Sequence, residues 1–256
     1  MSKTVVVWGM GEMGSVFARG FLKLGKRVVP VVRSSDPAAI AAEHPDPELV
    51  LVSVGEAALQ PVLETVPEAW HGKVALLQNE LLPSDWQKHP QYANDPDPTV
   101  ISVWFEKKKG MDSKPLISSP AFGPNAKLLV DALATLDIPA HEVATLDEMT
   151  YELVRKNVYI VTTNIAGLKK GGTVSELWNN HEAFARDVAS DVMDVQEVLV
   201  GSELPRERLI TGMLEAFDGD PDHGCMGRSA PARLARALAQ ADAAGLEVST
   251  LRQIAT

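Results

Sequence analysis

The chain has 256 residues, 45% of them hydrophobic, and a formal net charge of −10. This length and composition are typical of a globular protein with one or two domains, and the acidic charge argues against nucleic acid or an anionic membrane as the main partner. Cys225 is the single cysteine, which excludes an intramolecular disulfide and a multi-cysteine zinc site. No apolar run is long enough for a bilayer and no signal-peptide pattern is visible, so we expect a cytoplasmic protein.

A glycine-rich turn follows the first predicted strand. The apolar run 4–8 predicts a buried strand, and glycines at positions 9, 11 and 14 follow it with the G-x-G-x-x-G spacing. Helical periodicity over 15–24 and an apolar run over 27–32 predict the helix and second strand that this motif requires. The context therefore favours a dinucleotide-binding turn over a glycine-rich turn that binds nothing.

Each glycine of this turn has an expected role. Gly9 allows the tight turn, Gly11 leaves room for a pyrophosphate, and Gly14 permits close packing of the helix on the strand. The unpaired amides at the start of the helix favour a bound anion, and we expect the Glu12 carboxylate to point to solvent. The predicted cofactor-binding residues of the turn are Gly9, Met10, Gly11, Glu12, Met13 and Gly14.

The end of the second predicted strand indicates which dinucleotide is bound. An acidic residue there would bind the ribose hydroxyls of NAD, but this strand ends in Val-Arg-Ser-Ser, with Arg33 and Ser34 in the sequence. A guanidinium and a hydroxyl suit a 2′-phosphate, so we predict NADP as the cofactor. The alternative is an ordinary solvated arginine in a loop.

The rest of the N-terminal half predicts further strands and one clear helix. Ser53, Gln78 and Asn79 lie at the ends of two predicted strands, so they are candidates to line the cofactor site. The segment 82–98 is rich in proline and aspartate and predicts an irregular excursion, and Lys107–Gly110 predicts a solvated hairpin. The predicted elements are strands over 49–54, 73–77, 99–104, 115–118 and 140–143, a helix over 124–136, and a helical pattern over 56–66 that Pro61 interrupts.

The pattern changes at about Thr145, after which strand signals vanish. Helices are predicted over 146–169, 173–179, 181–200, 206–217 and 230–244. We therefore predict an α/β fold in which an N-terminal Rossmann-type parallel-sheet domain, residues 1–144, is followed by an all-helical C-terminal domain, residues 145–256. The first would bind NADP, and the second would contribute to substrate binding and dimerisation.

Two polar residues of the first long helix are the candidate catalytic residues. Lys156 and Asn164 are eight residues apart, just over two turns, and so fall near one largely uncharged face. A lysine beside a carbonyl could donate a proton to the alkoxide that forms during hydride transfer. The alternative is a lysine that reaches solvent or pairs with Glu152.

These motifs together resemble the ketopantoate reductase family of NADPH-dependent 2-keto acid reductases. The likeness rests on the glycine motif, on Leu77-Gln78-Asn79, and on Glu152-Leu153-Val154-Arg155-Lys156 with Asn164. It implies that Lys156 is the proton donor and Asn164 a substrate contact. It also implies that Arg33 binds the 2′-phosphate. Asn79 corresponds to the family's asparagine after the strand that precedes the segment 82–98.

Three positions depart from the family pattern. An asparagine one turn after the lysine is Ile160 here, and a lysine after the third strand is Gly55. The family's Gly-Arg-x-Thr-Glu segment corresponds to Gly227-Arg228-Ser229-Ala230-Pro231, so its glutamate is replaced by Pro231. These departures leave the substrate less defined than the cofactor.

The sequence therefore predicts an NADP-dependent oxidoreductase that reduces a small 2-oxo acid. A 3-hydroxyacid or imine reductase with the same two-domain plan, or a dinucleotide-binding sensor without turnover, are the alternatives. No metal-ligand spacing is visible, and we give Asp222 and His223, in a Gly/Pro-rich loop, less weight as ligands than as parts of a solvated turn. Helical domains of this kind often form dimers, so a homodimer is the assembly that analogy suggests.

Overall fold

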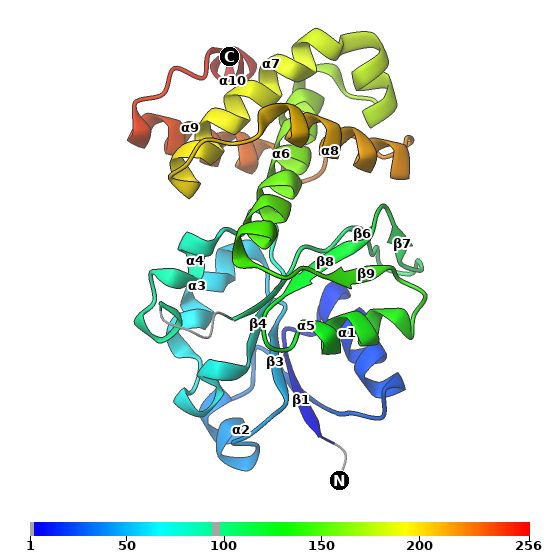
Figure 1. The fold of residues 1–256 in the computed structure, drawn as a ribbon, viewed down its shortest axis with the longest axis vertical. Helices are drawn as coiled ribbons and strands as arrows, with labels where there is room; N and C mark the ends of the chain where they lie inside the picture. The colour runs from blue at the N-terminus through cyan, green and yellow to red at the C-terminus, as the bar shows by residue number, and fades with distance from the viewer. Residues whose placement is uncertain (1–2, 94–97) are drawn as a thin grey trace. The chain divides into compact units, whose positions relative to one another are not determined.

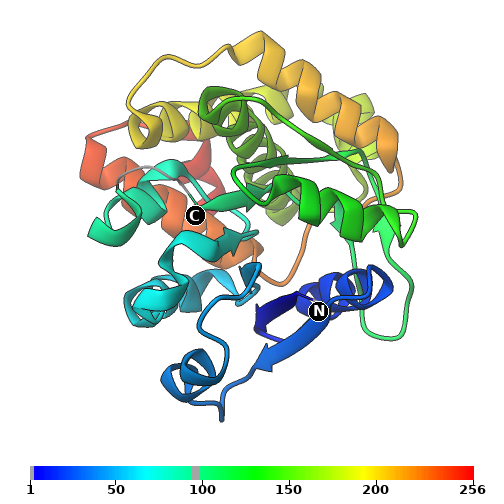
Figure 2. The same cartoon turned by 60° about the horizontal axis from the view of Figure 1, so that its bottom comes forward.

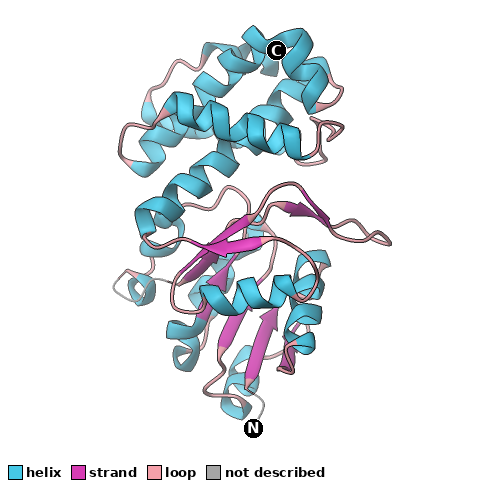
Figure 3. Ribbon diagram, turned by 45° about the vertical axis from the view of Figure 1, so that its right-hand side comes forward, coloured by secondary structure: helices cyan, strands magenta, loops and turns pink. Residues whose placement is uncertain are grey.

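The computed structural model describes residues 3–93 and 98–256, and the chain divides into two compact units between Glu152 and Leu153. Figure 3 shows that the strands belong to the first unit, whereas the second is built from helices. The helix α6 (Leu146–Lys170) begins where the sequence predicts the change from strands to helices and continues through the division. The predicted fold class, a Rossmann-type sheet followed by a helical region, is confirmed.

The first unit is organised on a seven-stranded sheet. Its strands are β1 (Thr4–Trp8), β2 (Arg27–Val31), β3 (Leu49–Val52), β4 (Val74–Leu76), β5 (Thr99–Ile101), β8 (Ser119–Phe122) and β9 (Ala140–Glu142). Their order is β2-β1-β3-β4-β5-β8-β9; the five strands from β2 to β5 are parallel, and β8 pairs with β5 antiparallel. The chain crosses from one side of β1 to the other between β2 and β3, and ligands of open parallel sheets bind at the carboxyl ends of strands at such a point.

Helices cover both faces of this sheet. Their bounds are α1 (Glu12–Lys23), α2 (Pro37–Glu43), α3 (Glu56–Thr65), α4 (Pro83–Gln87) and α5 (Ala126–Ala134), with short 3-10 helices at Glu68–Lys73 and Pro90–Tyr92. In Figures 1 and 2, α1 and α5 lie side by side on one face. A Cβ on Gly20 of α1 would lie 2.5 Å from the carbonyl oxygen of Ala132 in α5, so a glycine is what permits this close approach. The helix α3 runs without interruption through Pro61, contrary to the prediction, since its buried Leu59 and Leu63 anchor it on both sides of the proline.

The segment 82–98 is not the irregular excursion that the sequence predicts. Its described part contains α4 and a 3-10 helix, and Trp86 and Tyr92 are 0% and 1% exposed. Local proline and aspartate content predicted a loop, but burying two large aromatic side chains outweighs those local preferences. Residues 94–97 of this segment lie outside the described residues.

A short hairpin separates β5 from β8. The strands β6 (Phe105–Glu106) and β7 (Lys114–Pro115) pair antiparallel, so the hairpin predicted around the lysine run is confirmed. The predicted strand 115–118 is wrong in its bounds, because the sheet strand begins only at Ser119. The buried Ser119 hydroxyl accepts a hydrogen bond from the Trp104 amide at 2.9 Å, a contact between distant residues that no local pattern could reveal.

The second unit consists of α6 from Leu153 onward and of the helices that follow it. They are α6 (Leu146–Lys170), α7 (Val174–Val200), α8 (Arg206–Gly219), α9 (Ala230–Ala244) and α10 (Ser249–Ala255). The two helices predicted over 173–200 form one element with a kink at His181, whose φ of −143° is not helical. The last helix, α10, is absent from the sequence prediction; its Leu251 is buried, and Asp191 of α7 accepts hydrogen bonds from its first amides. Among the described residues, none of the helices is long and apolar enough to cross a membrane.

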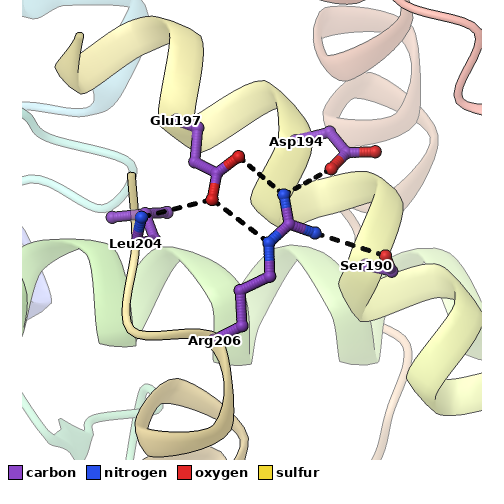
Figure 4. A network of polar contacts seen from close by, with 5 residues as sticks. All are labelled: Ser190, Asp194, Glu197, Leu204 and Arg206. Atoms are coloured by element: carbon purple, nitrogen blue, oxygen red, sulfur yellow. Dashed lines mark hydrogen bonds and ion pairs between the residues drawn. The ribbon is translucent and has the colours of Figure 1, made fainter. Parts of the chain in front are cut away.

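An arginine joins the end of α7 to the start of α8. Arg206 donates to Glu197 and Asp194, each at 2.6 Å, and to Ser190 (Figure 4). Glu197 also accepts from the Leu204 amide at 3.2 Å, so the connecting loop is fixed at both ends. The hydrogen bond from Arg206 lowers the pKa of the Glu197 carboxyl, which shows that the network favours the charged pair.

Candidate functional site

Two glycines of the turn after β1, Gly9 and Gly14, lie where a side chain would overlap neighbouring atoms. Gly9 has a φ of +101°, a conformation that glycine adopts without steric cost, and a Cβ there would lie 2.9 Å from the carbonyl oxygen of Ser53. A Cβ on Gly14 would lie only 1.9 Å from the carbonyl oxygen of Gly9. The turn and the start of α1 therefore pack against each other at a distance that side chains would prevent.

Gly11, in contrast, faces open space. A Cβ there would have no atom within 4 Å, and Gly11 and the neighbouring Met10 and Glu12 are exposed, with Met13 half-buried. Gly11 is also the N-cap residue of α1 and offers no side chain to the first amides of the helix. Packing therefore does not require a glycine at this position. The open surface suits the approach of a pyrophosphate to bare backbone at the positive end of a helix.

Two of the polar side chains predicted to line the cofactor site donate hydrogen bonds to backbone carbonyl oxygens at the edge of the sheet. The Ser53 hydroxyl donates to the carbonyl oxygens of Gly9 and Trp8, at 2.6 Å and 3.2 Å. Gln78, 5% exposed, donates from its amide to the carbonyl oxygens at 52 and 54. Both side chains therefore hold the ends of β1, β3 and β4 together. Asn79 is half-buried and donates to the Glu56 carboxylate at 3.2 Å.

Arg33 and Ser34 lie at the centre of a turn after β2. The Ser35 amide donates to the Val32 carbonyl and the Ser35 hydroxyl accepts from the Val32 amide, so the turn is closed by two hydrogen bonds. Arg33 and Ser34 are exposed. Asp36, the next acidic residue, is the N-cap of α2, and its carboxylate accepts hydrogen bonds from the first amides of that helix.

The candidate catalytic residues of α6 are both buried. Lys156 is 8% exposed and Asn164 is 7% exposed, in a helix whose neighbouring positions are mostly apolar. Arg155, on another face, donates to the Gly212 carbonyl and pairs with Glu215 of α8 at 2.7 Å. Asn157 donates to Gln196 of α7 at 3.0 Å. The polar residues around Lys156 therefore include two that fasten α6 to its neighbours.

Arg233 is a candidate site residue that the sequence reasoning missed. This residue of α9 is 6% exposed and donates to the Asn164 side-chain oxygen at 2.7 Å, while Asn164 donates to the Cys225 carbonyl at 3.1 Å. A usable signal existed, since Arg233 shares the buried face of α9 with four apolar residues: Ala230, Leu234, Ala237 and Ala241. A charged residue on the apolar stripe of an amphipathic helix indicates a specific partner.

The segment that resembles the family's C-terminal motif lies beside this asparagine. A Cβ on Gly227 would lie 3.7 Å from the Asn164 side-chain oxygen, and Pro231 occupies the first turn of α9, where proline fits the helix start. Pro231 is exposed. The polar group that this part of the chain presents to Asn164 is thus Arg233, two residues after the position of the family's glutamate.

The loop before this segment is a packed turn. The His223 ring is tilted by 47° to the Tyr159 ring, with 6.3 Å between the ring centroids, and its Nδ1 lies 3.6 Å from the buried Asp220 carboxylate, while Asp222 is exposed. Burial raises the pKa of the Cys225 thiol to about 11, which keeps it protonated and unreactive at neutral pH. Within the described ranges, no group of three or more His, Cys, Asp or Glu residues could hold a metal ion.

Comparison with known proteins finds similarity in structure alone. No family model matches the chain, and no curated protein matches it in sequence. A ketopantoate reductase from Ralstonia eutropha JMP134 is 16% identical with a TM-score of 0.67, and the match covers 98% of this chain and 95% of that one. D-mandelate dehydrogenase, solved with NADH and anilino(oxo)acetate, is 15% identical with a TM-score of 0.65, covering 98% and 96%.

A dimeric ketopantoate reductase from Staphylococcus aureus is similar to the same extent. It is 16% identical with a TM-score of 0.61, and the match covers 98% of this chain and 95% of that one. The resemblance predicted from the glycine motif and from the Lys156 and Asn164 spacing is therefore confirmed at the level of the fold. The chain has the fold that these ketopantoate reductases and D-mandelate dehydrogenase share.

Proposed function

We propose that this protein is an NADP-dependent reductase of a small 2-oxo acid. The observation that carries the proposal is the buried polar group of the helical unit, in which Arg233 donates to Asn164 on the helix that also bears Lys156. A buried cation next to an amide attracts a substrate carboxylate strongly, because the low dielectric of a buried site strengthens charge interactions. A 2-oxo acid presents both a carboxylate and the neighbouring carbonyl that a lysine can protonate.

The turn after β1 is the dinucleotide site in this proposal. The positive φ of Gly9, the close contact at Gly14 and the open backbone at Gly11 meet the requirements of a pyrophosphate cradle. Met10, Glu12 and Met13 complete the turn, and Asn79 lies at the end of β4 in the same unit. The bound cofactor would supply a hydride to the substrate carbonyl carbon.

NADP is the proposed cofactor because of the exposed turn after β2. Arg33 offers a fork of N–H donors to a 2′-phosphate, Ser34 offers a hydroxyl, and Asp36 is committed to capping α2. The fold alone does not decide this point, since D-mandelate dehydrogenase with a similar fold was solved with NADH.

Lys156 supplies the proton in this proposal. As the carbonyl carbon gains the hydride, the Lys156 ammonium gives a proton to the developing alkoxide, and solvent returns a proton to the lysine. The product is a 2-hydroxy acid. Asn164 orients the substrate, and Arg233 holds the carboxylate through N–H groups compatible with its bond to Asn164.

The test begins with separate titrations of NADPH and NADH by calorimetry. A panel of 2-oxo acids is then offered with the tighter cofactor, together with 3-oxo acids and cyclic imines, and oxidation of the cofactor is followed by absorbance. Tight NADPH binding with turnover of a 2-oxo acid supports the proposal. Turnover of imines alone would favour the related reductase, binding without any turnover would favour a sensor, and binding of neither dinucleotide would refute the proposal.

A cytoplasmic homodimer is the proposed state of the enzyme. Support for the dimer comes from the Staphylococcus aureus ketopantoate reductase of similar fold, which is described as dimeric. Sedimentation equilibrium across a range of protein concentrations tests this part, and a monomer at every concentration would contradict it.

A further inference from the structure

The hairpin of β6 and β7 is fastened to the helix that begins at the glycine turn. Phe105 of β6 is 5% exposed, and its ring centroid lies 6.3 Å from that of Phe17 in α1. Both side chains belong to the core cluster on this face of the sheet. This contact places the start of the lysine run, which the sequence predicts to be solvated, next to the first turns of α1.

Lys107 differs from the two lysines that follow it. Its side chain is 19% exposed, against 66% for Lys108, which pairs with Glu106 at the base of the same hairpin. The Lys107 ammonium donates to the carbonyl oxygens of Lys108 and Met111 and lies 3.3 Å from the Glu12 carboxylate. The ammonium is therefore held in place by its own turn and directed at Glu12. The prediction that the lysine run is solvated is wrong for this residue.

Glu12 presents an electrostatic difficulty at this turn. It is the first residue of α1, within the glycine motif, and its side chain is 45% exposed. A carboxylate there benefits from the helix dipole but repels the two negative charges of a pyrophosphate bound to the same turn. A positive charge beside the Glu12 carboxylate removes most of this repulsion, because the ion pair of Lys107 and Glu12 is neutral as a whole.

We propose that Lys107 is a charge-compensating residue for dinucleotide binding, which neutralises Glu12 so that the glycine turn accepts a pyrophosphate. The inference rests on the proposed function and adds a residue outside the glycine motif to it. The hairpin from Phe105 to Pro115 thus contributes to cofactor affinity through one lysine, although that lysine needs no contact with the cofactor.

The experiment measures NADPH affinity in Lys107→Met, Glu12→Gln and the double variant. Lys107→Met should weaken binding by about 3- to 10-fold in low salt, since it exposes the Glu12 charge to the pyrophosphate. The loss should shrink in 1 M NaCl, where the Debye length is only about 3 Å. Glu12→Gln alone should tighten binding, and adding it to Lys107→Met should remove the loss. Lys109→Met, in the exposed part of the same hairpin, is the matched control and should bind as the wild type.

The outcomes separate this inference from the proposed function. A wild-type protein that binds neither NADPH nor NADH refutes both. If the wild type binds NADPH and Lys107→Met binds equally well, only the role of Lys107 is refuted. Loss of binding that Glu12→Gln does not reverse also refutes charge compensation, because it indicates a direct contact between Lys107 and the cofactor. Thermal unfolding of each variant identifies any loss that comes from misfolding.

Discussion

The proposed dinucleotide site after β1 is formed by backbone, whereas the proposed substrate site in the helical unit is formed by side chains. Gly9, Gly11 and Gly14 offer a conformation, an open approach and a close contact, and each depends on the absence of a side chain. Lys156, Asn164 and Arg233 instead offer an ammonium, an amide and a guanidinium, all buried. The two regions should therefore respond to mutation in different ways: the turn through its geometry, and the helical cluster through its chemistry.

The largest effect is expected from Lys156→Met. Removing the proposed proton donor should lower kcat by about 10²- to 10⁴-fold while NADPH affinity stays unchanged, because the proposed dinucleotide site is the glycine turn after β1. Steady-state kinetics and calorimetry measure the two quantities. Lys169→Met, at the exposed end of the same helix, is the control and should keep full activity. A Lys156→Met variant with wild-type kcat would contradict the proposed role of Lys156 as the proton donor.

A second large effect is expected from Gly14→Ala. The added methyl group would overlap the Gly9 carbonyl oxygen, so we expect a loss of about 3 kcal/mol in the free energy of unfolding, at the upper end for overpacked sites. Urea unfolding measures this loss. Gly11→Ala provides the contrast, because its methyl group meets open space and should leave stability within about 0.5 kcal/mol while weakening NADPH binding. Equal stability losses in the two variants would contradict the separate roles of the glycines.

Arg233→Gln should selectively weaken the use of carboxylate substrates. Losing the charged hydrogen-bond donor that we propose for the substrate carboxylate should lower kcat/KM for a 2-oxo acid by about 10- to 100-fold. The neutral methyl ester of the same acid is the internal control, since kcat/KM for the ester should change little. If both substrates lose activity equally, Arg233 would act by positioning Asn164 rather than by binding the carboxylate.

The choice of cofactor should depend on Arg33. Arg33→Ala should weaken NADPH binding by about 10-fold or more and leave NADH binding unchanged, because only NADPH carries the 2′-phosphate. Arg27→Ala, at the exposed start of the strand β2 that precedes this turn, is the matched control. A parallel loss for both dinucleotides would assign Arg33 a structural role in the turn.

The smallest effect is expected from the network that joins α7 to α8. Arg206→Met should cost about 1 kcal/mol of unfolding free energy at neutral pH, since its partners are partly exposed to solvent. Arg206 lowers the folded-state pKa of Glu197 below the ordinary 4.5. The contribution of the pair is therefore present above pH 4.5 and is lost as the pH falls through the folded-state pKa of Glu197.

Urea unfolding at several pH values from neutral to acid checks this prediction. The difference between wild type and Arg206→Met should shrink below pH 4.5. Lys127→Met is the control for an isolated exposed pair with Asp131, and its stability should stay close to that of the wild type. A stability difference that persists in acid would assign the effect to packing of the arginine stem.

The glycine turn, the strand, helix and strand that surround it, and the change to helices at Thr145 follow from the sequence alone. The spacing of three glycines, the apolar run of β1 and the 3.6-residue period of the later helices are local patterns, and each is set by residues close together in the chain. The positions of Lys156 and Asn164 on one face follow from the same period. These features could be predicted because their physical causes span no more than a few turns.

Only the tertiary structure decided which polar residues meet. Arg233 lies 69 positions from Asn164, and Lys107 lies 95 positions from Glu12, so neither pair is visible in any local pattern. The burial of Trp86 and Tyr92 likewise overrides a proline-rich stretch that by itself predicts a loop. The sequence by itself determined the conformations that neighbouring residues prefer, whereas the partners of buried charges and large aromatic side chains depend on how distant segments pack.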